Sequence, residues 1–199
     1  MSLLSYTFLL FLLASLFAYY LVPKKFQWII LLAANTVFYA FSGIGNFVFI
    51  VLSSFVTYFT ARIVSELNSN LKLKKNELDK ADFKIEKQKV QNKKRVFLCI
   101  MLFINVGILV HLKYVNFLGH FHKIFLPLGI SYYTLQMIAY FMDVYNSKVE
   151  AESNFFKYFM FVSFFPQLIM GPINRFGQLG KQMQEKHSFD FENIKHGVC

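Results

Sequence analysis

The sequence has few charges and few cysteines for its length. Only 16% of its 199 residues are charged and 56% are hydrophobic, whereas soluble globular domains carry about 25% charged residues. This composition excludes a disordered chain, a fibrous repeat and a nucleic-acid tail. The two cysteines, Cys99 and Cys199, are too few for a disulfide scaffold. A soluble protein would need scattered apolar residues, and here they are clustered.

Long stretches of the chain contain no charged residue at all. These stretches cover residues 1–23, 26–61, 96–112, 124–142 and 158–174. A helix needs about 20 mostly apolar residues to cross a bilayer. The second stretch is too long for one crossing, and the turn signal Gly43-Ile44-Gly45-Asn46 lies in its middle. We therefore predict an all-α, polytopic integral membrane protein with about five transmembrane helices, near 3–22, 26–42, 46–62, 96–113 and 127–145.

A sixth apolar segment, at about 155–171, contains Pro166. Proline removes one backbone hydrogen bond and clashes with the carbonyl four residues earlier. Non-helical backbone at membrane depth is tolerated only where protein buries it or where it lines a cavity. A plain sixth crossing would also place the basic residues from Arg175 onward outside the cell, against the positive-inside rule. We expect a proline-broken or re-entrant segment, with the tail at the cytoplasmic surface.

The basic residues concentrate in one part of the chain. Residues 62–95 hold eleven of the 21 basic residues against five acidic ones, which is +6 of the total net charge of +10. The positive-inside rule places this segment in the cytoplasm and the N-terminus outside. No Lys or Arg precedes Lys24, so residues 1–23 lack the positive region of a signal peptide and are interpreted as the first span.

Residues 1–199 are therefore interpreted as a single membrane domain with a basic cytoplasmic loop at about 63–95. The charge of this loop fixes the topology, and attraction to anionic lipid would add about 1 kcal/mol per basic residue near the surface. The expected partner is the lipid bilayer, and no nucleic acid is expected.

The predicted helix at 127–145 has a polar face. At about 100° per residue, the polar face is formed by Tyr132, Gln136, Ala139, Tyr140 and Asp143. The opposite, apolar face is formed by Ile130, Met137, Ile138 and Phe141. Polar groups in lipid are costly and usually face a cavity or the bundle interior. Two interpretations stay open: the wall of a substrate path, and hydrogen bonding between helices of an ordinary bundle. We expect Asn35, Thr36 and Asn105 to form hydrogen bonds between helices.

The stretch from Ser163 to Arg175 combines two prolines with Gly171, Gln167 and Arg175. The guanidinium of Arg175 offers a fixed fork of donors that suits phosphate or carboxylate. The stretch is either a helix end with an interfacial arginine or a cavity-lining break that directs Arg175 toward an anionic group.

His120 and His122 form a His-x-His pair without a neighbouring carboxylate or thiol cluster, so we expect no metal site. Cys99 is expected to be a small apolar filler.

Two blocks of sequence resemble a known family. Leu126-Pro-Leu-Gly-Ile-Ser131, continuing through Gln136 to Asp143-Val-Tyr145, resembles the signature of the membrane-bound O-acyltransferase (MBOAT) family. Phe164-Phe-Pro-Gln-Leu-Ile-Met-Gly-Pro-Ile-Asn-Arg175 is similar to the second block of that family, in the right order and spacing. The resemblance is greatest to the bacterial alginate O-acetyltransferase type.

The resemblance implies the N-terminal half of the MBOAT fold and an acyltransferase in a bacterial inner (cytoplasmic) membrane. Acetyl-CoA or another acyl thioester would be the donor, with no bound cofactor. The acceptor would be an extracytoplasmic polysaccharide, reached through an extracytoplasmic acetyltransferase partner. The family's catalytic histidine lies in a later hydrophobic segment that none of the five histidines here matches, so we expect these 199 residues alone to be inactive.

On this interpretation the chain supplies no catalytic residue and no metal ligand. The candidates for lining a substrate path or for supporting it are Tyr132, Gln136, Asp143, Gln167 and Arg175. Three alternatives remain: D-alanyl transfer for teichoic acid modification, which belongs to the same family, a transporter or channel-like membrane protein, and a non-catalytic membrane scaffold.

Overall fold

The computed structural model describes residues 6–75, 79–118, 129–170, 174–180 and 182–185. Every regular element among them is helical, which confirms the predicted all-α class. The elements are α1 (Tyr6–Leu21), α2 (Gln27–Ser42), α3 (Ile44–Lys74), α4 (Lys80–Leu118), α5 (Ile130–Tyr145), α6 (Phe155–Val162), α7 (Phe165–Met170) and the π-helical turn η1 (Phe176–Gly180).

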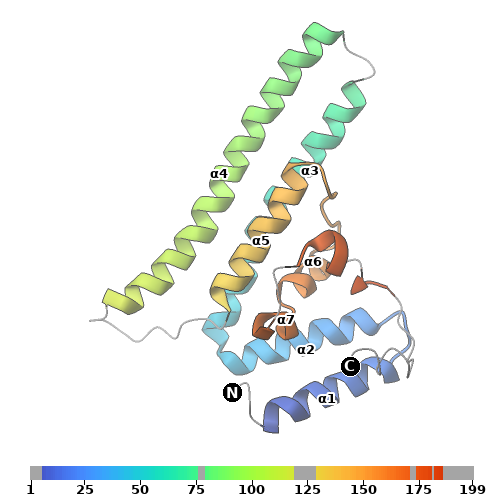
Figure 1. Ribbon diagram of the computed structural model, residues 1–199, viewed down its shortest axis with the longest axis vertical. Coiled ribbons are helices and arrows are strands. Elements are labelled where there is room, and N and C mark those ends of the chain that lie inside the picture. Colours follow the sequence, from blue (N-terminus) through green and yellow to red (C-terminus); the bar gives the residue numbers. More distant parts are fainter. Residues whose placement is uncertain (1–5, 76–78, 119–128, 171–173, 181, 186–199) are drawn as a thin grey trace.

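The two longest helices, α3 and α4, run antiparallel and form an extended hairpin (Figure 1). Helix α5 packs beside α3, and the short α6 packs against α2, α3 and α5. In the view of Figure 1, α2 extends to the right from the lower end of α3, and α1 lies below α2. Helix α3 is therefore the element that joins the long hairpin to the group of short helices.

Within the part of the chain that the structure describes, two helices are long and apolar enough to cross a membrane. They span Phe47–Lys74 in α3 and Lys80–Lys113 in α4. The apolar helices Tyr6–Leu21 and Gln27–Phe41 are shorter than the usual crossing length of about 17–25 residues. Length and composition alone thus support two crossings directly.

The predicted turn between the second and third spans is shorter than expected. Helix α2 ends at Ser42 and α3 begins at Ile44, so only Gly43 lies between them. Gly43 has φ of 121°, a conformation that glycine adopts readily because it lacks a Cβ atom. Gly45 already belongs to α3, so the prediction of a turn over 43–46 was too wide.

The predicted basic loop is a helical hairpin. Helix α3 continues to Lys74 and α4 begins at Lys80, so the hairpin reaches about 18 Å beyond Arg62 at about 1.5 Å per residue. Near its tip, Lys74 Nζ lies 2.7 Å from Glu86 Oε1. The hydrogen bond from Lys74 and its positive charge lower the pKa of the Glu86 carboxyl.

A second contact fastens the hairpin to α5. Lys94 Nζ donates a hydrogen bond of 2.5 Å to the backbone oxygen of Tyr145. The same ammonium lies 4.4 Å from the centroid of the Tyr145 ring. Burial lowers the pKa of Lys94. The hairpin is therefore tied to the bundle at the end of α5.

Aromatic rings fill the space between the short helices. Phe38 of α2 stacks on Phe165 of α7, with ring centroids 5.1 Å apart. Tyr140 of α5 lies 4.7 Å from Tyr158 of α6 and 5.0 Å from Phe176 of η1. Such ring pairs contribute about 0.5–1.5 kcal/mol beyond the burial of their area. This aromatic core positions the segment that carries the candidate site.

Candidate functional site

The segment predicted to be broken is interrupted between α6 and α7. Helix α6 ends at Val162 and α7 begins at Phe165. Pro166 is the second residue of α7, in the first turn of a helix, where a missing N–H costs little. The interruption therefore precedes the proline, and backbone groups on both sides of it lose their helical partners.

Asn35 of α2 bridges this interruption. Its Nδ2 donates to the backbone oxygen of Met160 (3.1 Å), and its Oδ1 accepts from the backbone N–H of Phe165 (3.3 Å). The Asn35 side chain is fully buried. One amide thus pairs with a carbonyl before the break and with an N–H after it, which confirms the expectation that Asn35 joins two helices.

Gln136 of α5 binds the break from the other side. Its Nε2 donates to the backbone oxygen of Phe161 (3.2 Å) and to Oε1 of Gln167 (3.1 Å). Both glutamines are buried, with 1% and 5% of their surface exposed. The structure thus brings together two of the predicted site residues, one from each of the two family-like sequence blocks.

We call Asn35, Gln136 and Gln167 the amide clamp. A buried polar group left without a partner costs about 1–3 kcal/mol, so the clamp stabilises an irregular backbone that would otherwise be unsatisfied. None of these three side chains titrates near neutral pH, so the clamp can hold, orient and donate hydrogen bonds but cannot act as a general acid or base.

The other predicted site residues lie around the clamp or away from it. Asp143 is buried at the far end of α5, about 10 Å along the helix axis from Gln136. Tyr132 lies about one turn before Gln136 and is half-buried. Arg175 is exposed and immediately precedes η1. Gln136 and Gln167 are joined by a hydrogen bond.

Helix α5 is covered on both of its predicted faces. Met137 and Phe141, on the side predicted to be apolar, are fully buried, as are Gln136 and Tyr140 on the polar side. The side chain of Leu135 is 49% exposed. Part of the polar face of α5 is explained by contacts within the bundle: the Tyr140 hydroxyl, for example, accepts a hydrogen bond of 3.0 Å from Glu152 N in the chain between α5 and α6.

A second polar contact links α3, α4 and α5. Asn105 Nδ2 of α4 donates to Thr57 Oγ1 of α3 (3.1 Å), and Thr57 Oγ1 lies 3.6 Å from the sulfur of Met137 in α5. The expectation that Asn105 joins two helices is confirmed. The same expectation for Thr36 was wrong, because its hydroxyl donates to Leu32 O within its own helix, as threonine hydroxyls in helices often do. Thr57 was not predicted from the sequence as the partner of Asn105.

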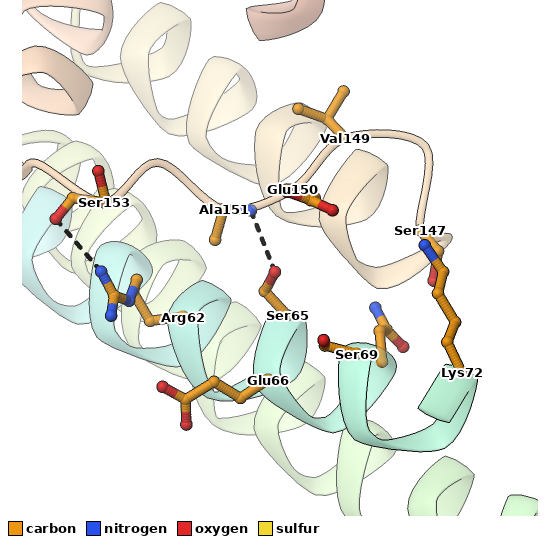
Figure 2. A pocket seen from close by; sticks show the side chains of 11 residues that line it. Arg62, Ser65, Glu66, Ser69, Lys72, Ser147, Val149, Glu150, Ala151 and Ser153 are labelled. Carbon is orange, nitrogen blue, oxygen red and sulfur yellow. Dashed lines mark hydrogen bonds between the residues drawn. The ribbon is translucent and has the colours of Figure 1, made fainter. Parts of the chain in front are cut away.

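Sequence reasoning also missed a polar cavity of about 310 Å³ between α3 and the chain that follows α5 (Figure 2). Two hydrogen bonds hold its walls together: Ala151 N donates to Ser65 Oγ (3.2 Å), and Arg62 Nη1 donates to Ser153 O (3.2 Å). We call it the Arg62 cavity. Its lining residues are Arg62, Ser65, Glu66, Asn68, Ser69, Lys72, Ser147, Val149, Glu150, Ala151 and Ser153. The helical spacing of Arg62, Glu66 and Ser69 was the signal that could have revealed it.

The described residues contain no group of three or more His, Cys, Asp or Glu side chains that could hold a metal ion. His111 is exposed on α4. Cys99 is also exposed on α4. Outside the described residues lie His120, His122, Gly171, His187, His196 and Cys199.

Known proteins with similar sequences carry related names. The chain is 29% identical to a peptidoglycan O-acetyltransferase of Helicobacter pylori, over 89% of this chain and 36% of that protein. It is 30% identical to a probable alginate O-acetylase, AlgI, of Azotobacter vinelandii, over 86% of this chain and 34% of that protein. It is also 30% identical to a probable AlgI of Pseudomonas aeruginosa, over 91% of this chain and 34% of that protein.

The resemblance to the alginate O-acetyltransferase type is thereby confirmed over most of the chain. The chain spans about a third of the length of these curated relatives. No family model and no solved structure matches it.

Proposed function

Because this chain is related over most of its length to bacterial O-acetyltransferases of the alginate O-acetylase type, we propose that it is part of a membrane-bound O-acyltransferase. The reaction is transfer of an acetyl group to a hydroxyl of a polysaccharide. The relatives' names specify peptidoglycan and alginate, which favours a cell-surface polysaccharide over teichoic acid as the acceptor.

The observation that carries the proposal is the hydrogen bond between Gln136 and Gln167. These residues belong to the two sequence blocks on which the family resemblance rests, and those blocks contact each other at an interrupted helix. Irregular backbone within a membrane needs a protein environment that pairs its polar groups. The amide clamp provides that environment, and it supports the role of this segment as one wall of a reaction chamber.

The arrangement of the long helices supports a polytopic topology. Asn68 Nδ2 of α3 donates to Val144 O of α5 (2.9 Å), while Thr57 and Met137 meet nearer the N-terminal ends of the same helices. Helices α3 and α5 therefore run in the same direction and α4 in the opposite one. We propose five crossings in the inner membrane with the N-terminus outside, a broken sixth segment, and a cytoplasmic hairpin.

This topology fits an acetyl donor on one side of the membrane and an acceptor on the other. In the proposed reaction the acceptor oxygen attacks the thioester carbonyl carbon and the carbon–sulfur bond breaks, while a general base takes the proton of the acceptor hydroxyl and returns it to the departing thiolate, which leaves as the thiol. Acetyl-CoA is the proposed donor, and a separate extracytoplasmic acetyltransferase the proposed partner. The part played by this chain is to hold the backbone of the chamber wall through the amide clamp.

A genetic experiment tests the function. The gene that encodes this chain is deleted and then restored, and the acetate released by mild alkali is measured in peptidoglycan and in exopolysaccharide. We expect the deletion to lose ester-linked acetate from one fraction and the restored gene to recover it, which also identifies the acceptor. The proposal would be rejected if the deletion strain kept the same ester-linked acetate as the other strains in each fraction. A changed solute uptake with normal acetate would instead indicate transport.

A further inference from the structure

The Arg62 cavity lies where α3 leaves the apolar part of the chain. The charge-free stretch of α3 ends at Ala61, and the next residue, Arg62, lines the cavity. The stretch of α5 ends just before Asp143, and the opposite wall of the cavity begins at Ser147. In the membrane placement proposed above, on which this inference rests, the cavity is at the level of the cytoplasmic lipid headgroups.

The cavity carries balanced charge. Arg62 and Lys72 are opposed by Glu66 and Glu150, and most of the remaining lining groups are hydroxyls and backbone. Figure 2 shows Arg62 turned toward Ser153 and Lys72 extended toward Ser147, at opposite ends of the lining. A lining with two positive and two negative groups does not attract a polyanion, but it does complement a ligand that carries one charge of each sign.

Arg62 retains hydrogen-bonding capacity in this arrangement. Its Nη1 donates to Ser153 O, and a guanidinium has five N–H donors in total. Its planar fork suits the paired oxygens of a phosphate. Glu66 and Glu150 are both exposed and line the cavity, one from α3 and the other from the chain after α5.

One face of α3 presents an ordered series of groups. Phe55, Phe59, Arg62 and Glu66 follow one another at intervals of four, three and four residues, which places them in line along the helix. The rings of Phe55 and Phe59 lie 4.5 Å apart and are 50% and 47% exposed. Along α3, from its apolar part toward the basic hairpin, this face is first apolar, then cationic and then anionic.

We propose that the Arg62 cavity binds phosphatidylethanolamine. The order of groups on α3 is the order within that lipid: an acyl chain lies along Phe55 and Phe59, the phosphate binds Arg62, and the ammonium binds Glu66 and Glu150. A primary ammonium donates three hydrogen bonds, whereas the quaternary ammonium of phosphatidylcholine donates none. Phosphatidylglycerol has no positive group to bind the two carboxylates.

Lipid retention measures this binding without any assay of acetyl transfer, so its failure is distinguishable from failure of the proposed function. The full chain is reconstituted in bilayers with equal parts of phosphatidylethanolamine, phosphatidylcholine and phosphatidylglycerol, extracted gently, and analysed by native mass spectrometry. We expect retained phosphatidylethanolamine to exceed phosphatidylcholine at least about fivefold, because charge-assisted hydrogen bonds distinguish the two headgroups.

Two variants separate the roles of the charges. The double variant Glu66→Gln/Glu150→Gln should lose the preference for phosphatidylethanolamine and retain more phosphatidylglycerol, because the cations then face no carboxylates. Arg62→Gln should lower the retention of both phosphatidylethanolamine and phosphatidylglycerol. The matched controls are Asp82→Asn and Lys84→Gln, which change exposed charges on α4 outside the cavity and should leave the preference unchanged.

Glu66 and Glu150 are exposed, so replacing their carboxylates by amides should leave the fold intact. A size-exclusion profile identical to that of the unmodified chain checks this. Equal retention of the three phospholipids by the unmodified chain would overturn the proposal. The same preference in the unmodified chain and in Glu66→Gln/Glu150→Gln would overturn it as well.

Discussion

Gln136 and Gln167 lie 31 positions apart in the sequence, yet their side-chain amides meet at 3.1 Å inside the bundle. Gln136 also donates to Phe161 O, the carbonyl whose helical partner in an unbroken helix would have been the N–H of Phe165. That N–H is bound instead by Asn35. Two amides from α2 and α5 thus replace hydrogen bonds that the break between α6 and α7 removes.

Replacing Gln136 by Ala should lower both stability and acetyl transfer. The substitution leaves Phe161 O and Gln167 with one donor fewer in a buried environment, at a cost of about 1–3 kcal/mol in the free energy of unfolding. The measurement is the unfolding temperature of the purified protein in detergent, together with ester-linked acetate in cells at equal expression. Gln91→Ala, an exposed amide on α4, is the control, and equal effects of the two substitutions would contradict the prediction.

Asn35 and Thr36 are neighbours with opposite expected sensitivities. Asn35→Ala removes two hydrogen bonds to the interrupted segment and should lower the free energy of unfolding by about 1–3 kcal/mol. Thr36→Val removes only a bond to Leu32 O in the same helix, so a change below about 0.5 kcal/mol is expected. Denaturant unfolding of both variants in the same detergent compares them. A larger loss in Thr36→Val than in Asn35→Ala would refute the assignment.

Arg175→Ala should separate function from stability. Because Arg175 is exposed at the entry to η1, its removal should change the free energy of unfolding by no more than about 0.5 kcal/mol. The sequence-based expectation is that the guanidinium contacts an anionic group, so acetate transfer should fall. The informative result is reduced acetylation at an unchanged unfolding temperature, and unchanged acetylation would exclude a role in substrate contact.

Much of the helical order could be predicted from the distribution of charge. The helix predicted at 26–42 is observed as α2 (Gln27–Ser42), and the helix predicted at 127–145 ends, as predicted, at Tyr145. These ends could be predicted approximately, because Gly43 interrupts the charge-free stretch 26–61, and the stretch 124–142 ends three residues before α5 does. The break before Pro166 could also be predicted from the sequence, because proline acts locally on the helix that contains it.

The partners of the buried groups could not be predicted in the same way. Asn35 contacts Met160 O over a separation of 125 residues, and no local pattern specifies such a pairing. The helical wheel of α5 separates polar from apolar side chains, but it does not show that Phe141 is buried while Leu135 is half exposed. The sequence left the structure of the basic segment open between a helix and an irregular loop, because its few apolar residues form no continuous helical stripe.

The tip of the hairpin should respond to pH and salt. The pKa of Glu86 is lowered by Lys74 in the folded chain, so the stabilisation from this pair is present above the carboxyl's ordinary pKa of about 4.3 and is lost as the pH falls through the folded value. Spin labels at Leu73→Cys and Ile85→Cys, both exposed sites, should report a broader distance distribution at about pH 3 than at about pH 7. High salt should also broaden it, because screening weakens an exposed pair.

The control for this experiment is Glu86→Gln in the same labelled background. It should show the broad distribution at neutral pH and little further change on acidification. If the distribution in the unmodified chain were the same at both pH values, the Lys74–Glu86 contact would not hold the tip closed.

Labelling from outside the cell tests the proposed orientation. In a background with Cys99→Ala and Cys199→Ala, the substitution Gly45→Cys, at the start of α3, should react with an impermeant maleimide in intact cells. A Cβ atom at Gly45 meets no atom within 4 Å, so the substitution is tolerated. Asn92→Cys, exposed on the basic hairpin, should react only after the membrane is permeabilised, because the positive-inside rule predicts a cytoplasmic location for a segment with eleven basic residues. The reverse pattern would invert the topology and would place the Arg62 cavity on the outer face of the membrane.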